Sequence, residues 1–400
     1  MRKILFITKN MGCGGVEKTL LNLMQSIKDE YDIDLLLLEK TGEFLEFVPE
    51  KVRVMQIDLP RVWQDVLRYD EQGVKEGFKN LWNGGKRGTA VLFVFIKLLN
   101  RLWSILWKRT LLYDICERKY KLPTEHYDVV CDYHGYGHFT TKIAANYENA
   151  KRFTWIHIEK IDRAFLCMRR EYTKFDGIFG VSKECLINFQ KEFPEISSDK
   201  LILLYNLMNR EELQRMALLS PTKKYDIEDF FVIVSVGRLS TQKGFDLTVE
   251  VANILNKREH RFIWIILGEG PERDNLERLI SKYGLEERVI LHGLDTNPYT
   301  YMAMADLYVQ TSRYEGFATT LSEAVVLCKP IVSTKFAGVE QQVVDGVNGI
   351  LAEFDKMDIV TKIEGLMKNK ELCSVYAQGC DKVKLPINKT LEKIHELFNS

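Results

Sequence analysis

Two acidic and two basic residues have types and spacing that could do chemistry on a phosphorylated sugar. Glu315 and Glu323 stand with seven residues between them in RYEGFATTLSEAVVLCKP, and Arg238 and Lys243 precede them in SVGRLSTQKGFD. Each pair lies where an apolar strand pattern gives way to an amphipathic helix pattern. Parallel α/β sheets bind ligands at that position. The four residues together predict a nucleotide-sugar site.

The basic loop suits a diphosphate. Arg238 and Lys243 flank the end of a strand and the start of a helix, so two cations and the helix N-terminus could neutralise a departing anion. The alternative is that both residues are ordinary solvated surface charges, and the sequence leaves this choice open.

The acidic pair suits sugar hydroxyls. Glu315 is expected in a turn and Glu323 about two helical turns further on, so both can face one side of the helix. One carboxylate could bind a ribose and the other a transferred sugar, while the amides of residues 316–319 point at phosphate. The alternative is a charge at the helix start and a surface glutamate in mid-helix.

The elements that must position these residues alternate between short apolar strands and helices. The strands are expected in KILFIT, IDLLLL, VRVMQI, YDVVCD, RFTWIHI and GIFGV, and then in FFVIVSV, RFIWIILG, RVILHG, DLYVQ and KPIVST. A helix is expected to open at Pro271, because proline suits the first helical turn. Strands that are apolar over their whole length indicate parallel sheets covered on both faces.

The polar stretch 206–229 separates the two series of strands. We therefore expect an α/β protein of two doubly wound, Rossmann-like domains that face a central cleft. Residues 1–206 form the first domain and 207–380 the second, and a C-terminal helix within 381–400 packs back on the first.

Bulk composition excludes several classes of protein. Lys plus Arg and Asp plus Glu both total 56 in 400 residues, so no global charge favours nucleic acid. The eight cysteines lack the two-residue spacing of a zinc or redox site, and no histidine pair has a metal-ligand spacing. We expect reduced thiols and no metal. The apolar run of MRKILFIT is too short for a secretory signal, which favours a cytoplasmic protein.

A glycine-rich turn follows the first strand. Gly12, Gly14 and Gly15 suggest a dinucleotide fingerprint, but its third glycine would fall at Glu17, so an NAD site is disfavoured. Bare glycines serve equally well to let a phosphate or sugar approach the backbone.

Three histidines lie at expected strand ends. His157 lies near the end of RFTWIHI, on the ligand side of its sheet, and could touch a reacting sugar. His134 and His138 lie in DYHGYGH, a glycine- and aromatic-rich loop suited to carbohydrate. A tight turn with structural histidines explains that loop equally well.

The basic segment 86–112 is amphipathic. On a helix, Leu92, Phe95, Leu99, Leu102 and Leu106 lie opposite a polar stripe of Lys97, Arg101, Ser104 and Lys108. Its uncharged stretch is too short to span a bilayer. It fits a helix in an anionic membrane interface, or an ordinary domain helix that buries its apolar stripe.

The second half of the chain resembles the donor-binding domain of retaining, two-domain (GT-B) glycosyltransferases of family 4 that build capsule and cell-envelope polysaccharide. Four blocks agree in order: SVGRLSTQKGFD, LGEGPERDNLERLISKYGLEERVILHG, YEGFATTLSEA and GVEQQVVDGVNGIL. The resemblance implies a metal-independent hexosyltransferase without a cofactor. It would take a nucleotide diphosphate sugar, favouring UDP, and a glycan or lipid-linked acceptor.

By this resemblance, Arg238 and Lys243 hold the donor diphosphate, Glu323 the ribose and Glu315 the transferred sugar. His157 joins Glu315, Lys243 and Arg238 as the catalytic set. The remaining donor-binding residues implied are Gly14, Gly15, Gly268, Leu294, Gly316, Phe317, Ala318 and Thr319.

The sequence departs from the family pattern at two places. Cys328 stands where relatives usually have glycine, and Glu340 and Gln341 replace a common proline and glutamate. The second change adjoins the donor in the family, so it could alter recognition of the sugar. Two other functions stay open: a nucleotide-sugar epimerase of the same fold, and a non-catalytic sugar-nucleotide-binding partner of a transferase. We expect a cytoplasmic protein, peripheral at the inner face of the plasma membrane if 86–112 binds lipid.

Overall fold

The computed structural model describes residues 1–59, 67, 74–107, 110–120, 123, 125–385 and 389–400. The chain divides into two compact units. The first comprises Met1–Gly12, Val16–Leu204 and Leu391–Ser400, and the second comprises Cys13–Gly15 and Tyr205–Thr390. The division along the chain therefore falls between Leu204 and Tyr205, just before the polar stretch.

The first unit is built on a parallel sheet with strand order β3-β2-β1-β4-β5-β6-β7 among the described residues. Its strands are β1 Lys3–Thr8, β2 Asp32–Leu37, β3 Arg53–Gln56, β4 Val129–Asp132, β5 Lys151–Ile156, β6 Gly177–Gly180 and β7 Leu201–Leu203. Its helices are α1 Gly15–Ile27, α3 Val74–Asn83, α4 Arg87–Trp107, α5 Leu111–Lys119, α6 Phe139–Ala145, α7 Arg163–Cys167, α8 Arg169–Tyr172, α9 Lys183–Glu192 and α17 Thr390–Asn399.

The C-terminal helix α17 belongs to the first unit. The Arg2 guanidinium donates to the carbonyl oxygen of Phe398 at 2.6 Å, and the Phe398 ring lies 6.5 Å from Phe6 of β1. Phe398 is fully buried. The two ends of the chain are therefore joined through the same core.

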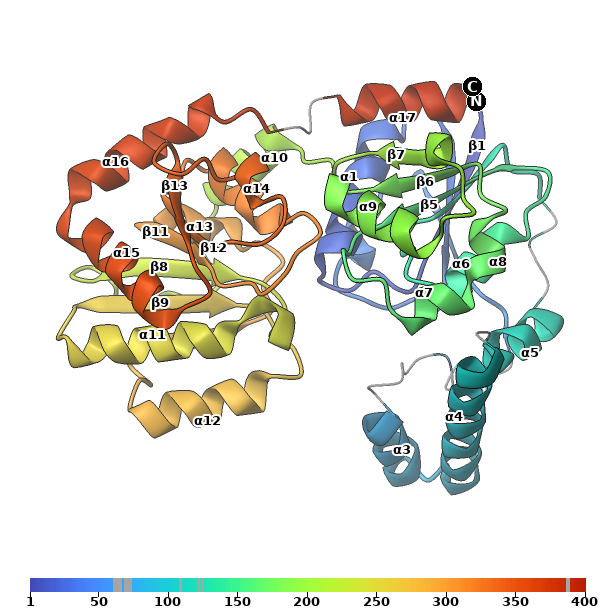
Figure 1. The fold of residues 1–400 in the computed structure, drawn as a ribbon, viewed down its shortest axis with the longest axis horizontal. Coiled ribbons are helices and arrows are strands. Elements are labelled where there is room, and N and C mark those ends of the chain that lie inside the picture. The colour runs from blue at the N-terminus through green and yellow to red at the C-terminus, as the bar shows by residue number, and fades with distance from the viewer. Residues whose placement is uncertain (60–66, 68–73, 108–109, 121–122, 124, 386–388) are drawn as a thin grey trace. The chain divides into compact units, whose positions relative to one another are not determined.

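The second unit repeats the plan with strand order β10-β9-β8-β11-β12-β13, again all parallel among its described strands. Its strands are β8 Phe231–Val236, β9 Phe262–Leu267, β10 Val289–Gly293, β11 Leu307–Gln310, β12 Ile331–Thr334 and β13 Gly349–Ala352. Its helices are α10 Arg210–Ala217, α11 Phe245–Lys257, α12 Arg273–Tyr283, α13 Tyr299–Met304, α14 Thr319–Val326, α15 Lys356–Lys368 and α16 Lys370–Gly379. Helices cover both faces of each sheet (Figure 1), so the predicted two doubly wound domains are confirmed.

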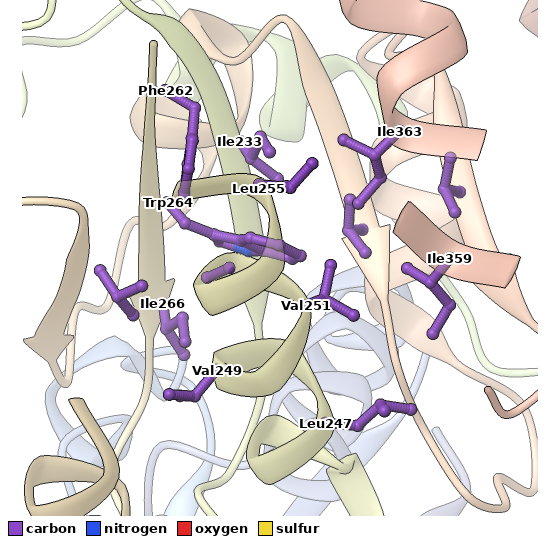
Figure 2. Close-up of a cluster of buried hydrophobic side chains, with 14 of the residues drawn as sticks. Ile233, Leu247, Val249, Val251, Leu255, Phe262, Trp264, Ile266, Ile359 and Ile363 are labelled. Carbon is purple, nitrogen blue, oxygen red and sulfur yellow. The ribbon is translucent and has the colours of Figure 1, made fainter. Parts of the chain in front are cut away.

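A hydrophobic core holds α11 and α15 against the second sheet (Figure 2). Trp264 of β9 is fully buried beneath α11, and its indole N–H donates to the Ser235 hydroxyl at 3.0 Å. Phe245 and Leu247, at the start of α11, pack into the same cluster. This packing fixes the start of α11, and so it positions the loop that carries Lys243.

Two sequence predictions about elements are wrong in detail. The helix expected at Pro271 begins two residues later, at Arg273, because residues 271–272 form a turn. The short strands β7 and β13 were not expected. Both complete the edges of their sheets.

Helix α4 leaves its apolar stripe exposed. Phe95 is 56% exposed and Leu102 is 58% exposed, and Leu92 and Leu99 are exposed too. With α3 it forms a hairpin that extends away from the sheet of its unit (Figure 1). The interpretation as a helix that buries this stripe in its own domain is therefore wrong for these residues. The predicted Leu106 and Lys108 side chains lie outside the described residues.

The opposite face of α4 is the buried one. It carries Ala90, Phe93, Asn100 and Ser104, all buried, and Asn100 accepts a hydrogen bond from the Leu112 N–H of α5 at 3.0 Å. Ser104 therefore does not lie on a solvated polar stripe as predicted, whereas Arg101 is exposed. None of the described helices is long and apolar enough to cross a membrane.

Candidate functional site

The loop between β8 and α11 is held by close backbone approaches. Gly244, directly after Lys243, has φ +66°, and a Cβ there would lie 2.1 Å from the Thr311 carbonyl oxygen. At Gly237 a Cβ would lie 3.1 Å from Cδ and Cε of Lys243, so the lysine stem crosses the bare backbone. Only glycine fits the first position, and a small residue is required at the second.

Gly268, directly after β9, packs against the same loop. Its φ is +141°, and a Cβ would lie 1.9 Å from the Gly237 carbonyl oxygen. The ends of β8 and β9 therefore touch through glycine backbones. This contact explains the residue type at Gly268 without a ligand, and it leaves the predicted role at the nucleotide untested.

Glu315 is a buried carboxylate, 6% exposed, at the centre of a hydrogen-bond network. Its Oε1 accepts from Lys243 Nζ at 2.7 Å, from Ser312 Oγ at 2.6 Å and from Gln310 Nε2 at 3.1 Å. Its Oε2 accepts from Gln242 Nε2 at 3.2 Å. The charge is thus paired and solvated by neutral donors, as a buried carboxylate requires.

The network orients Lys243. An ammonium has three N–H donors, and Glu315 takes one of them in a fixed direction. The Lys243 side chain keeps some exposure while Glu315 is nearly enclosed. Lys243 therefore presents a positive charge at the carboxyl ends of β8 and β11, and the Glu315 carboxylate fixes its position.

Glu323 is also buried, at 7% exposed, in the middle of α14. Its Oε1 accepts from the Tyr299 hydroxyl of α13 at 2.9 Å. Burial, and then the Glu323 charge, raise the pKa of Tyr299 well above its usual value, so the phenol stays a donor. The alternative of a surface glutamate in mid-helix is therefore wrong for Glu323.

The other predicted residues of the second unit are placed differently. The Arg238 side chain is exposed, and Leu294 is exposed beyond the end of β10. Gly316, Phe317 and Ala318 are buried in the turn before α14, which begins at Thr319. The structure therefore brings Lys243 and Glu315 into direct contact and leaves Arg238 facing solvent.

In the first unit, the predicted residue His157 lies directly after β5. Its Nε2 lies 2.9 Å from the Tyr133 carbonyl oxygen. Because a carbonyl can only accept, this nitrogen carries the proton. Burial lowers the pKa of His157 to about 4, so the imidazole is neutral near pH 7 and its Nδ1 is a bare acceptor. Gly14 and Gly15 lie at the start of α1.

Sequence reasoning missed the residues that support the two acids. Gln310 is the last residue of strand β11 and Ser312 follows that strand, whereas Tyr299 precedes α14 by a whole strand. A polar residue that ends an otherwise apolar strand was the available signal for Gln310. Among the described residues, no group of three His, Cys, Asp or Glu side chains could hold a metal ion. None of the eight cysteines forms a disulfide, and five of them are buried.

Residues 222–382 match the family described as Glycosyl transferases group 1. The chain is 32% identical over 223 residues to the N-acetylgalactosamine-N,N'-diacetylbacillosaminyl-diphospho-undecaprenol 4-alpha-N-acetylgalactosaminyltransferase of Campylobacter jejuni, covering 54% of this chain and 59% of that protein. It is 25% identical over 414 residues to the poly(ribitol-phosphate) alpha-N-acetylglucosaminyltransferase of Staphylococcus aureus, covering 96% and 76%. The first match thus spans little more than half of the Campylobacter protein.

A solved structure shows the same fold. HepE of Anabaena, crystallised with UDP and glucose, matches with a TM-score of 0.71 at 16% sequence identity, covering 100% of both chains. This likeness supports the GT-B fold, which consists of two Rossmann-like domains.

Proposed function

We propose that this chain, whose residues 222–382 match the glycosyl transferases group 1 family, is a retaining hexosyltransferase of cell-surface polysaccharide synthesis. It moves a hexosyl unit from a nucleotide diphosphate sugar to a glycan or lipid-linked glycan. The observation that carries the proposal is the 2.7 Å pair of Lys243 and buried Glu315 at the carboxyl ends of a parallel sheet. Such sheet edges bind ligands, and a fixed cation there suits a diphosphate.

The chemistry follows from where charge grows. As the bond between the anomeric carbon and the diphosphate breaks, Lys243 and Arg238 stabilise the negative charge on the leaving group. Preorganised cations can supply several kcal/mol to such a step. The acceptor oxygen bonds to the same face of the anomeric carbon, and its proton passes to the departing phosphate oxygen. Glu315 and His157 hold the transferred sugar, and Glu323 holds the ribose.

Two similarities support the choice of substrates. HepE of Anabaena was crystallised with UDP, which favours a UDP-linked donor here. The name of the Campylobacter relative includes a diphospho-undecaprenol acceptor, which favours a lipid-linked glycan.

A sugar-nucleotide panel tests the proposal. Purified protein is incubated with each donor, with and without membrane extract, and the released nucleoside diphosphate is measured. Release that depends on the extract is expected. Conversion of the donor without acceptor would instead indicate an epimerase, and binding without turnover would indicate a non-catalytic partner.

We propose further that the protein is cytoplasmic and that segment 86–112 docks it on the inner face of the plasma membrane. Helix α4 exposes Phe95 and Leu102. Between Glu76 and Asp114 the chain holds seven basic residues and no acidic one. Like charge of this density opposes contact between two copies of the segment and favours an anionic lipid surface. Docking there would bring the enzyme to a lipid-linked acceptor.

Liposome flotation tests the docking. Wild type should float with vesicles of phosphatidylglycerol and phosphatidylcholine. Two variants should remain in the bottom fraction: Phe95→Ser/Leu102→Ser, and the triple alanine variant of Lys97, Arg101 and Lys108. Ile187→Ser is the matched control, because Ile187 is an exposed apolar residue on α9 of the same unit. Equal recovery of all variants would discard the lipid surface, and dimers in light scattering would point to a second copy instead.

A further inference from the structure

A cluster of aromatic rings lies at the carboxyl end of β4, in the loop 133–138 that joins it to α6. The ring centroids of His134 and Tyr136 are 4.8 Å apart, and those of His134 and His138 are 5.3 Å apart. The Tyr136 ring also lies 6.3 Å from His157, nearly perpendicular to it. The loop therefore adjoins the histidine assigned to the transferred sugar, although the chemistry proposed above does not use it.

Two glycines fix the direction of Tyr136. Gly135 has φ +60° and Gly137 has φ +66°. A Cβ at Gly135 would lie 1.4 Å from the Trp155 carbonyl oxygen, and one at Gly137 would lie 2.4 Å from that of Ala164. No other residue fits at either position without moving the backbone. The loop is thus packed tightly against its neighbours on both sides of the tyrosine.

Hydrogen bonds hold the same loop. The buried Tyr172 hydroxyl donates to the Gly135 carbonyl oxygen at 2.7 Å, and the Gly135 N–H donates to Asp132 Oδ1 at 3.3 Å. A backbone held in this way presents Tyr136 in one orientation before any ligand arrives. Such preorganisation lowers the entropy that the loop would lose on binding a ligand.

His134 has a polar atom that the protein does not satisfy. Its Nδ1 is buried and has no hydrogen-bond partner among the described residues. Burial, and then the neighbouring His138 and Lys9 charges, lower the pKa of His134 well below its usual value. The imidazole is therefore neutral, and it suits a hydroxyl better than a phosphate. A buried polar atom without a partner calls for an explanation, which a ligand hydroxyl would supply.

We propose that the loop 133–138 is an acceptor subsite in which a neutral pyranose ring stacks its C–H face on Tyr136 and hydrogen-bonds His134 through a hydroxyl. The half-buried aromatic ring supplies the apolar surface, and the imidazole nitrogen fixes the orientation of the sugar. The inference rests on the proposed transferase function. It makes Tyr136 and His134 residues that select the acceptor, separate from the donor residues of the second unit.

Saturation-transfer NMR tests the subsite in the full chain. The ligands are methyl glycosides of glucose, galactose, N-acetylglucosamine and N-acetylgalactosamine, each added with UDP present. At least one glycoside should receive saturation on its ring protons from wild type. Tyr136→Leu should weaken its binding about five- to tenfold, whereas Tyr136→Phe keeps it within about twofold. His134→Phe, which keeps a ring but lacks the nitrogen, should also weaken it.

Controls separate this inference from the wider function. Phe47→Leu changes an exposed aromatic residue of the same unit and should bind the glycoside like wild type. Calorimetry should give equal UDP affinity for all variants. Unchanged glycoside binding by Tyr136→Leu and His134→Phe overturns the subsite, and so does a wild type that binds no glycoside in the panel. If the transferase proposal itself fails, the donor panel described above will show no release of nucleoside diphosphate from any sugar nucleotide.

Discussion

Replacing Lys243 with alanine removes the only cation in direct contact with Glu315 among the described residues, at 2.7 Å. The remaining carboxylate is 6% exposed and keeps Ser312, Gln310 and Gln242 as neutral donors. Breaking a fully buried pair costs about 3 to 5 kcal/mol. Because three donors remain and Lys243 is partly exposed, we expect Lys243→Ala to lower the free energy of unfolding by about 2 kcal/mol.

The expected effect on transfer is larger than the effect on stability. Removal of one preorganised group that stabilises growing charge lowers turnover about 10²- to 10³-fold. Lys243→Ala should therefore lose at least about a hundredfold in the rate of nucleoside diphosphate release. The rate is measured at saturating donor, at a temperature where circular dichroism shows the variant to be folded.

A double variant separates the two effects. In Lys243→Ala/Glu315→Gln the unpaired charge is gone and the amide still accepts hydrogen bonds, so about 1 kcal/mol of stability should return. Transfer should not return, because the cation is still missing. Lys335→Ala is the control: it breaks an exposed pair with Glu353 and should leave both stability and rate nearly unchanged. Near-normal turnover in Lys243→Ala, or recovery in the double variant, would refute the leaving-group argument.

Four further predictions follow from single residues. Glu323→Gln should weaken UDP binding about tenfold in calorimetry, because a charged acceptor for the ribose is lost, and unchanged affinity would contradict that role. Gly244→Ala should cost about 2 kcal/mol or more in urea unfolding, since its Cβ would lie 2.1 Å from a backbone oxygen. The control Gly365→Ala, in open space on α15, should instead stabilise by about 0.5 to 1 kcal/mol. Cys328→Gly should raise the melting temperature, because φ +53° costs a non-glycine residue about 1 kcal/mol; a lower value would contradict this. Burial lowers the pKa of His157 to about 4 from 6.5, so the unfolded chain binds more protons between these values and stability falls as the pH drops through them. In His157→Gln the free energy of unfolding should therefore fall less between about pH 7 and about pH 5 than it does in wild type.

The sequence predicts the strands well because a parallel strand is apolar on both faces. Each of the eleven expected strands is present. The two that were missed lie at sheet edges, where the pattern is shortest. β7 has three residues, and β13 opens at Gly349, where a Cβ would lie 2.3 Å from the Ile331 carbonyl oxygen. Glycine at that position serves the packing of neighbouring strands, and this contact has no local signal.

The site could be predicted only in part, for a related reason. The type and spacing of Lys243 and Glu315 point to one ligand, but their mutual contact depends on how two loops from different strands meet. Gln310 and Ser312 support Glu315 from sequence positions that carry no motif of their own. A residue that serves another residue is visible only once the fold has brought them together.

In helix α4, the spacing of apolar residues predicts which side chains share a face but not what contacts that face. The pattern correctly separates a stripe containing Phe95 and Leu102 from the rest of the helix, but it does not state what covers that stripe. In the described structure the helix buries Asn100 and Ser104 and leaves the apolar stripe in solvent. Natural sequences break local rules chiefly where function or strain requires it. An exposed apolar stripe surrounded only by basic charges is therefore better explained by contact with another surface, such as an anionic membrane, than by poor packing within the protein.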